Sequence, residues 1–149
     1  MTTPYVWVVR KGHPLEKEAE RKGFVAREVA VRFPQVIANA QPDRRREPNG
    51  PAEGWFAQGA ERPIAAMPFF LAAPYFLDDR AVTLVPKATA ETVFDEGRFA
   101  LLATEPGAPQ LTMRLAWTAA RDRDPFHQWM RALLTSAAQE LNEEKESGA

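Results

Sequence analysis

Apolar and polar stretches alternate along the chain in a pattern that predicts short strands separated by short helices. Residues 5–9 form a continuous run of aromatic and β-branched residues, which predicts a buried strand ending at the charged turn 10–12. Similar short apolar runs predict further strands at residues 35–38, 64–67, 81–85 and 99–103. Strict alternation across residues 111–117 predicts a half-buried strand, with Leu111, Met113, Leu115 and Trp117 on one face.

Proline and glycine mark where the predicted helices begin and end. One helix should start at Pro14 and end at Gly23, and another should follow Pro86 as far as Val93 or Phe94. A further helix over residues 69–77 should be disrupted at Pro74. Residues 24–31 are ambiguous but could be helical, and residues 51–58 predict a short helix that ends at Gly59.

The last helix has the clearest pattern. Asp124 is suited to be its N-cap and Pro125 its first residue. Apolar residues then recur at three- and four-residue steps, at Phe126, Trp129, Met130, Leu133, Leu134, Ala137 and Leu141. The polar tail over residues 142–149 is expected to fray.

Alternating strands and helices indicate a layered α/β fold with a largely parallel sheet. The length of 149 residues and the hydrophobic fraction of 45% suit one domain over residues 1–149. The proline-rich segment 41–51 predicts a polar loop. Its Arg44, Arg45 and Arg46 could bind phosphate, but a solvated loop is favoured because Asp43 and Glu47 weaken the local positive field.

Composition narrows the functional classes. The chain has no cysteine, which excludes disulfides, thiolate nucleophiles and cysteine-ligated zinc. The formal net charge of −1 provides no general attraction to nucleic acid or anionic lipid. Apolar runs such as residues 63–77 are too short and proline-rich to cross a membrane, and the N-terminus lacks the features of a signal peptide. A cytoplasmic location is therefore expected.

The residues available for catalysis are few. His13 and His127 are the only histidines, and Ser136 and Ser147 the only serines, all without the pattern of a catalytic triad or a zinc site. Glycine-rich phosphate and dinucleotide motifs are absent too. We therefore expect no catalytic residues, no metal, no cofactor and no enzyme activity. A carboxylate mechanism through residues 78–79 stays open as a third hypothesis, although turn and capping roles are favoured for these aspartates.

Two stretches resemble the effector domain of LysR-type transcriptional regulators. Residues 8–15 (VVRKGHPL) resemble a strand and turn midway through that domain, and residues 62–134 resemble the part that follows. The landmarks occur in the same order and spacing, at residues 68–74 (PFFLAAP), 82–86 (VTLVP), 115–117 (LAW) and 122–129 (DRDPFHQW). Residues 51–58 match a helix of the family, whereas residues 23–31 match poorly.

The resemblance implies a fold like that of type 2 periplasmic binding proteins, in which two α/β subdomains enclose an inducer cleft. Residues 4–10 would cross between the subdomains, and residues 24–93 would form most of one subdomain with a mixed sheet. Residues 111–117 and the last helix would belong to the other, incomplete, subdomain. The family's helix-turn-helix has no counterpart here, so direct DNA contact is not implied. The chain would be either an excised piece or a natural truncated relative.

Junctions from strand through proline to helix are the places where a ligand is expected, because ligands of open α/β sheets bind beyond the carboxyl ends of strands. The predicted ligand-binding residues are Pro68, Phe69, Phe70, Thr83, Val85 and Lys87. The aromatic residues among them could instead be core, and Lys87 could simply be solvated. The expected partners are a small organic effector, aromatic or carboxylate, and a second chain, either another copy or a full-length regulator. Self-association would occur through residues 111–117 and the last helix.

Overall fold

A computed structural model describes residues 2–38, 63–67 and 73–147, and the predicted loop 41–51 and helix 51–58 lie outside them. The chain divides into two compact units. The sheet unit comprises Thr3–Leu111, and the C-terminal unit comprises Met1–Thr2 with Thr112–Ala149. Each unit is described by itself.

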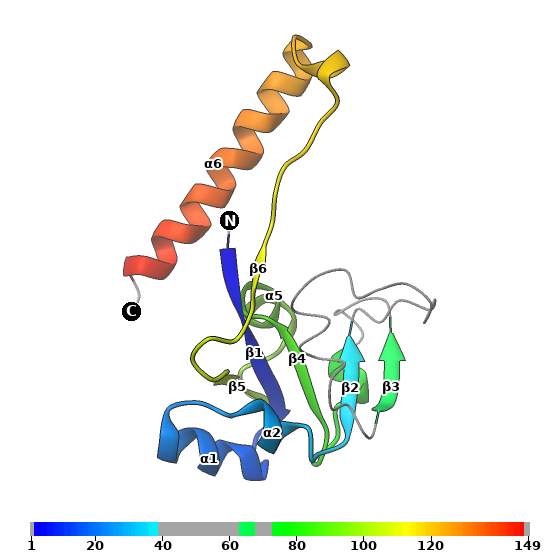
Figure 1. The fold of residues 1–149 in the computed structure, drawn as a ribbon, viewed down its shortest axis with the longest axis vertical. Coiled ribbons are helices and arrows are strands. Elements are labelled where there is room, and N and C mark those ends of the chain that lie inside the picture. The colour runs from blue at the N-terminus through cyan, green and yellow to red at the C-terminus, as the bar shows by residue number, and fades with distance from the viewer. Residues whose placement is uncertain (1, 39–62, 68–72, 148–149) are drawn as a thin grey trace. The chain divides into compact units, whose positions relative to one another are not determined.

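A mixed sheet forms the centre of the sheet unit (Figure 1). Its strands are β1 (Thr2–Arg10), β2 (Gln35–Ala38), β3 (Pro63–Met67), β4 (Val82–Pro86), β5 (Phe99–Ala103) and β6 (Gln110–Thr112). The order is β3-β2-β4-β1-β5, and β6 pairs with β1. The five predicted strands from residues 5–9 to 99–103 are thus confirmed.

The strand directions match the parallel sheet expected for an α/β fold except at β1. β2 runs parallel to both β3 and β4, whereas β1 is antiparallel to both β4 and β5. β4 and β5 therefore point the same way on either side of β1, as expected for strands joined by a helix. The mixed sheet implied by the family resemblance is confirmed, because the N-terminal strand lies between two strands of opposite direction.

Short helices connect the strands. They are α1 (Pro14–Lys22), α2 (Arg27–Ala30), α4 (Ala73–Phe76) and α5 (Lys87–Val93). α1 begins and ends as the sequence predicts, since His13 is its N-cap and Gly23 ends it at φ 81°. Pro74 lies in the first turn of α4, where a proline is tolerated, and residues 68–72 of the predicted helix lie outside the described part.

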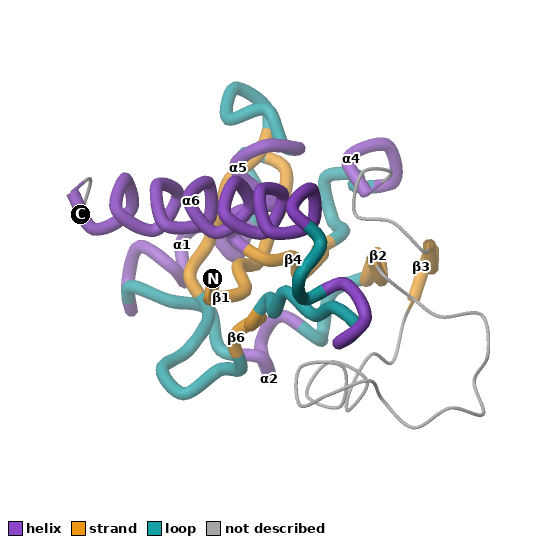
Figure 2. The backbone as a smooth tube through the Cα atoms, turned by 90° about the horizontal axis from the view of Figure 1, so that it is seen from above, coloured by secondary structure: helices purple, strands orange, loops and turns teal. Residues whose placement is uncertain are grey.

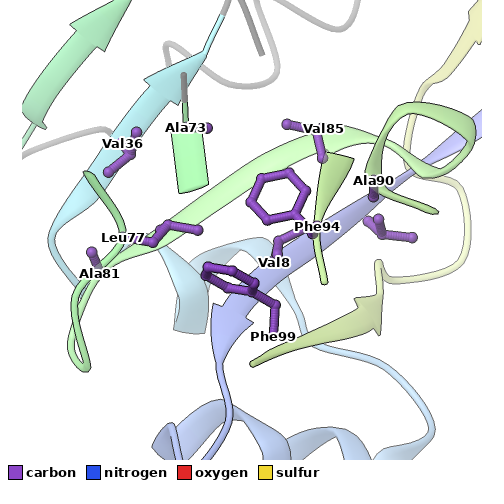
Figure 3. Close-up of a cluster of buried hydrophobic side chains, with 10 residues drawn as sticks. Val8, Val36, Ala73, Leu77, Ala81, Val85, Ala90, Phe94 and Phe99 are labelled. Atoms are coloured by element: carbon purple, nitrogen blue, oxygen red, sulfur yellow. The ribbon is translucent and has the colours of Figure 1, made fainter. Parts of the chain in front are cut away.

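Two apolar clusters cover the two faces of the sheet. Along β1, Val6 and Val8 point into one cluster, and Trp7 and Val9 into the other. Figure 3 shows the first cluster, in which Val8 and Val85 of the sheet lie with Leu77, Phe94 and Phe99. The second cluster packs the sheet against α1 and α2 through Leu15, Val25 and Ala30. Burial on both faces explains why β1 and β4 are continuous apolar runs rather than alternating ones.

Asp78, one of the two aspartates that a carboxylate mechanism would need, has a clear structural role. Oδ1 of Asp78 accepts hydrogen bonds from the backbone N–H groups of Arg80 and Ala81, both at 2.8 Å. This arrangement forms the turn predicted at residues 78–80 and leads the chain into β4.

The predicted strand over residues 111–117 is wrong beyond its first residues. β6 covers only Gln110–Thr112, and residues 113–118 have no regular secondary structure. Met113, Leu115 and Trp117 are exposed to about half of their surface. A two-residue alternation specifies a strand only where a neighbouring strand accepts its hydrogen bonds, and the described residues provide no such neighbour after Thr112.

The C-terminal unit is built around α6 (Pro125–Ser147), which Figure 2 shows as one continuous helix. Asp124 caps it as predicted, because its Oδ1 accepts from the N–H groups of Phe126 and His127. The turn before α6 is held by Arg131, whose guanidinium lies 4.5 Å from the ring centroid of Trp117 and donates to the carbonyl of Asp122. The helix is assigned as far as Ser147, and the fraying of residues 142–149 stays a prediction.

Candidate functional site

The carboxyl ends of three strands meet at one edge of the sheet unit. β3, β2 and β4 are adjacent and mutually parallel, so Met67, Ala38 and Pro86 end at the same edge (Figure 1). The strand ends that lead into the two predicted ligand-binding junctions, Met67 and Pro86, therefore share this edge, which we call the effector edge after the ligand predicted there. Pro68, Phe69 and Phe70 lie outside the described residues.

Thr83 and Val85 are both buried within β4. The Thr83 hydroxyl donates a 2.7 Å hydrogen bond to the backbone oxygen of Val36, which ties β4 to β2. The Val85 side chain is fully buried in the cluster that includes Phe94. The structure thus gives both residues a role in packing the sheet, and their role in ligand binding stays a prediction.

Replacing Thr83 by valine is expected to lower the free energy of unfolding by about 1–2 kcal/mol. The change keeps the shape of the side chain but leaves the buried Val36 carbonyl without this donor. Chemical denaturation would measure the difference. Thr92→Val is a matched control, because the Thr92 hydroxyl makes a similar bond to Ala88 on an exposed helix surface. Equal effects of the two changes would contradict this prediction.

At the start of α5, the two residues after Pro86 differ in their availability to a ligand. The N–H of Ala88 donates to the hydroxyl of buried Thr3 at 3.3 Å, so a protein group already occupies this amide. Lys87 is half exposed, and its ammonium lies 3.6 Å from Glu91 one turn later. A half-exposed ion pair of this kind is weak, which leaves Lys87 able to turn toward an anion.

A pocket of about 340 Å³ lies elsewhere in the sheet unit. Arg10, Tyr75, Asp95, Arg98 and Phe99 line it together with two apolar residues. None of these residues was predicted from the sequence to bind a ligand, and Arg10 was assigned only to the end of a strand and the turn after it. No sequence signal links Arg10 to Arg98, because only the pairing of β1 with β5 brings them together.

The described residues contain neither a cluster of metal ligands nor a helix that could span a membrane. Across residues 2–38, 63–67 and 73–147, no three histidine, aspartate or glutamate side chains gather as a metal site would require. In the same part of the chain, no helix has the length and hydrophobicity needed to span a bilayer.

The sheet unit thus has a mixed α/β fold in which three parallel strands end at one edge. The chain is similar in structure to the regulatory domain of MexT, a transcriptional activator in Pseudomonas aeruginosa, with a TM-score of 0.66 and 16% sequence identity. The match covers 91% of this chain and 64% of that domain, so the chain spans somewhat less than two thirds of its length. The similarity confirms the fold that the resemblance to LysR-type effector domains implied.

A second solved structure, a probable transcriptional regulator from Pseudomonas aeruginosa, matches with a TM-score of 0.49 and 20% identity over 74% of this chain and 35% of its own. No family model and no curated protein matches the sequence.

Proposed function

We propose that this chain is the ligand-sensing part of the regulatory domain of a LysR-type transcriptional regulator, and that it has no enzyme activity. The observation that carries the proposal is the fold shared with the MexT regulatory domain over 91% of the chain. The ordered sequence landmarks, from residues 8–15 to 122–129, support the same assignment. DNA binding would then belong to another part of the regulator, which acts in the cytoplasm.

The effector edge is the proposed binding place for a small organic acid. Three parallel strands end there, and α5 begins there, so backbone amides and Lys87 can contribute positive potential. Lys87 would supply the charge, and the chain leading out of β3 would supply Pro68, Phe69 and Phe70 as apolar contacts.

A panel of small aromatic and aliphatic acids, titrated into the whole chain, tests this proposal. Binding at the effector edge is expected to shift the amide resonances of Thr83, Lys87 and Ala88 saturably. Lys87→Gln should weaken the best acid about tenfold, because it removes a charge-assisted hydrogen bond. Lys17→Gln is the control, since Lys17 is an exposed lysine on α1. A panel without any saturable response at these three residues would argue against effector sensing at this edge.

An interaction module that joins a full-length regulator is the second candidate, and a specific observation favours it. The C-terminal unit exposes several large apolar side chains, namely Met113, Leu115, Trp117, Phe126, Trp129, Leu133 and Leu134. Phe126, Trp129 and Leu133 recur at helical spacing on α6, which gives the helix an apolar stripe. Exposed apolar surface of this kind commonly marks a protein interface.

Sedimentation equilibrium tests whether this apolar stripe also mediates self-association of the chain. The chain is expected to associate with rising concentration, and Trp129→Asp should abolish the association because it puts a charge in the apolar stripe. Tyr75→Asp is the matched control, since Tyr75 is 87% exposed but lies in the sheet unit. A chain that stays monomeric at high concentration would contradict self-association through α6.

A further inference from the structure

We propose that the sheet unit carries a second binding site, for a small organic anion, in the pocket between Arg10, Arg98 and Phe99. The pocket has a volume of about 340 Å³, at the small end of the range of ligand sites. It is formed by the ends of β1 and β5, by α4, and by the turn that follows α5. All of these segments belong to the sheet unit.

The pocket presents two cationic groups on one aromatic ring. The guanidinium carbons of Arg10 and Arg98 each lie 5.7 Å from the centroid of the Phe99 ring. Phe99 is buried and contacts Phe94 edge to face with centroids 5.2 Å apart, so the ring is fixed by the core behind it. The ring therefore attracts both guanidinium groups to this end of β1 and β5.

Neither arginine forms an ion pair within the described part of the chain. There, no carboxylate lies within 4.0 Å of either guanidinium. The one acidic residue of the pocket, Asp95, turns its Oδ1 to the N–H of Gly97 at 2.8 Å. The pocket therefore has two cationic groups and one carboxylate, and its net positive charge would attract an anion.

Both arginines have N–H groups that can donate hydrogen bonds to such an anion. Nε of Arg10 donates to the carbonyl of Leu77 at 2.6 Å, which fixes the side chain and leaves its terminal N–H groups for a ligand. Arg98 is exposed, and its side chain makes only the ring contact among the described residues. Pro74 and Val93 add apolar groups to the lining of the pocket. A single acidic group on a short apolar body, such as an aryl carboxylate or aryl phosphate, matches this combination.

The pocket lies far from the effector edge. Tyr5 pairs with Pro86 at that edge, whereas Arg10 pairs with Phe99 at the other end of β1. Five residues of extended strand correspond to about 17 Å. Occupancy of the pocket is therefore a property separate from effector binding at Lys87, and either site can be present without the other.

Titration of the whole chain with benzoate and phenyl phosphate tests the site, with neutral benzamide as the isosteric control. We expect at least one anion to shift the amide resonances of Tyr75, Arg98 and Phe99 saturably, and benzamide to leave them unchanged. Arg98→Gln should weaken the anion about tenfold or more. Arg98 is exposed, so this variant should fold normally, and Arg123→Gln is the matched exposed control.

Several results would overturn the site. These are an equal response to benzamide, unchanged affinity in Arg98→Gln, and no saturable shift at these three residues with either anion. Shifts confined to Thr83, Lys87 and Ala88 would also overturn it while supporting the effector edge. Failure of one site is thus distinguishable from failure of the other.

Discussion

Trp7→Ala is expected to lower the free energy of unfolding by about 3–5 kcal/mol, the largest effect of any change suggested for this chain. Trp7 is 1% exposed and packs in the cluster that joins the sheet to α1 and α2. Its register partners on the two neighbouring strands are Leu84 and Leu102, so truncation would leave a cavity at the centre of the sheet. Its indole N–H also donates to the carbonyl of Val25 at 3.2 Å.

Chemical denaturation followed by circular dichroism would measure the loss. Since domains of this size are stable by only about 5–15 kcal/mol, such a loss removes a large part of the stability, and Trp7→Phe is the milder second variant. It keeps most of the apolar contact but lacks the indole N–H, so an intermediate loss is expected. Tyr75→Ala is the control, because Tyr75 is an aromatic residue of the same unit that is 87% exposed, and its loss should change stability by less than about 0.5 kcal/mol. A loss at Trp7 no larger than this control would contradict the central packing role.

His13 should make the stability of the fold depend on pH. Burial lowers the pKa of His13 from its ordinary value of 6.5, and the hydrogen bond to Arg80 and the charges of Glu16 and Asp78 oppose this only in part. The neutral ring with its proton on Nε2 satisfies both neighbours. Nδ1 accepts from the N–H of Leu15, and Nε2 donates to the carbonyl of Arg80 at 3.2 Å. A proton on Nδ1 would remove the acceptor that caps α1.

The sign of the effect follows from the lowered pKa. Above pH 6.5 the histidine is neutral in both states and its contribution is complete. As the pH falls below 6.5, the unfolded chain binds a proton that the folded chain resists, so stability falls. The slope reaches at most about 1.4 kcal/mol per pH unit and ends when the pH passes the lowered pKa of the folded state.

Denaturation curves for the wild type and His13→Asn, measured at a series of pH values from above 6.5 downward, would show this pH dependence of stability. Asparagine can still cap the helix but does not titrate, so this variant should lose the slope and keep part of the cap. His13→Ala should lose the slope and a further 1–2 kcal/mol, about the value of an N-cap. His127→Asn, in the C-terminal unit, should keep the slope. An unchanged slope in His13→Asn would show that another group is responsible.

The candidate sites differ in how far the sequence could predict them. The junction of β4 with α5 was predictable, because a buried apolar run followed by proline marks a strand end and a helix start locally. The internal hydrogen bond of Thr83 was not, because its acceptor, Val36, belongs to a distant part of the chain. The alternation over residues 111–117 misled the analysis for a related reason, since a residue pattern cannot supply the partner strand that it requires.

By itself, the sequence determined where most strands and helices begin and end. It did so through apolar runs, prolines and caps such as His13 and Asp124, all of which act within a few residues. Only the tertiary structure decided that β1 lies between β4 and β5 in the opposite direction, and hence that Arg10 and Arg98 share the ring of Phe99. The reason is physical: strand pairing depends on which distant segments bury their apolar faces together, and local patterns do not encode that choice.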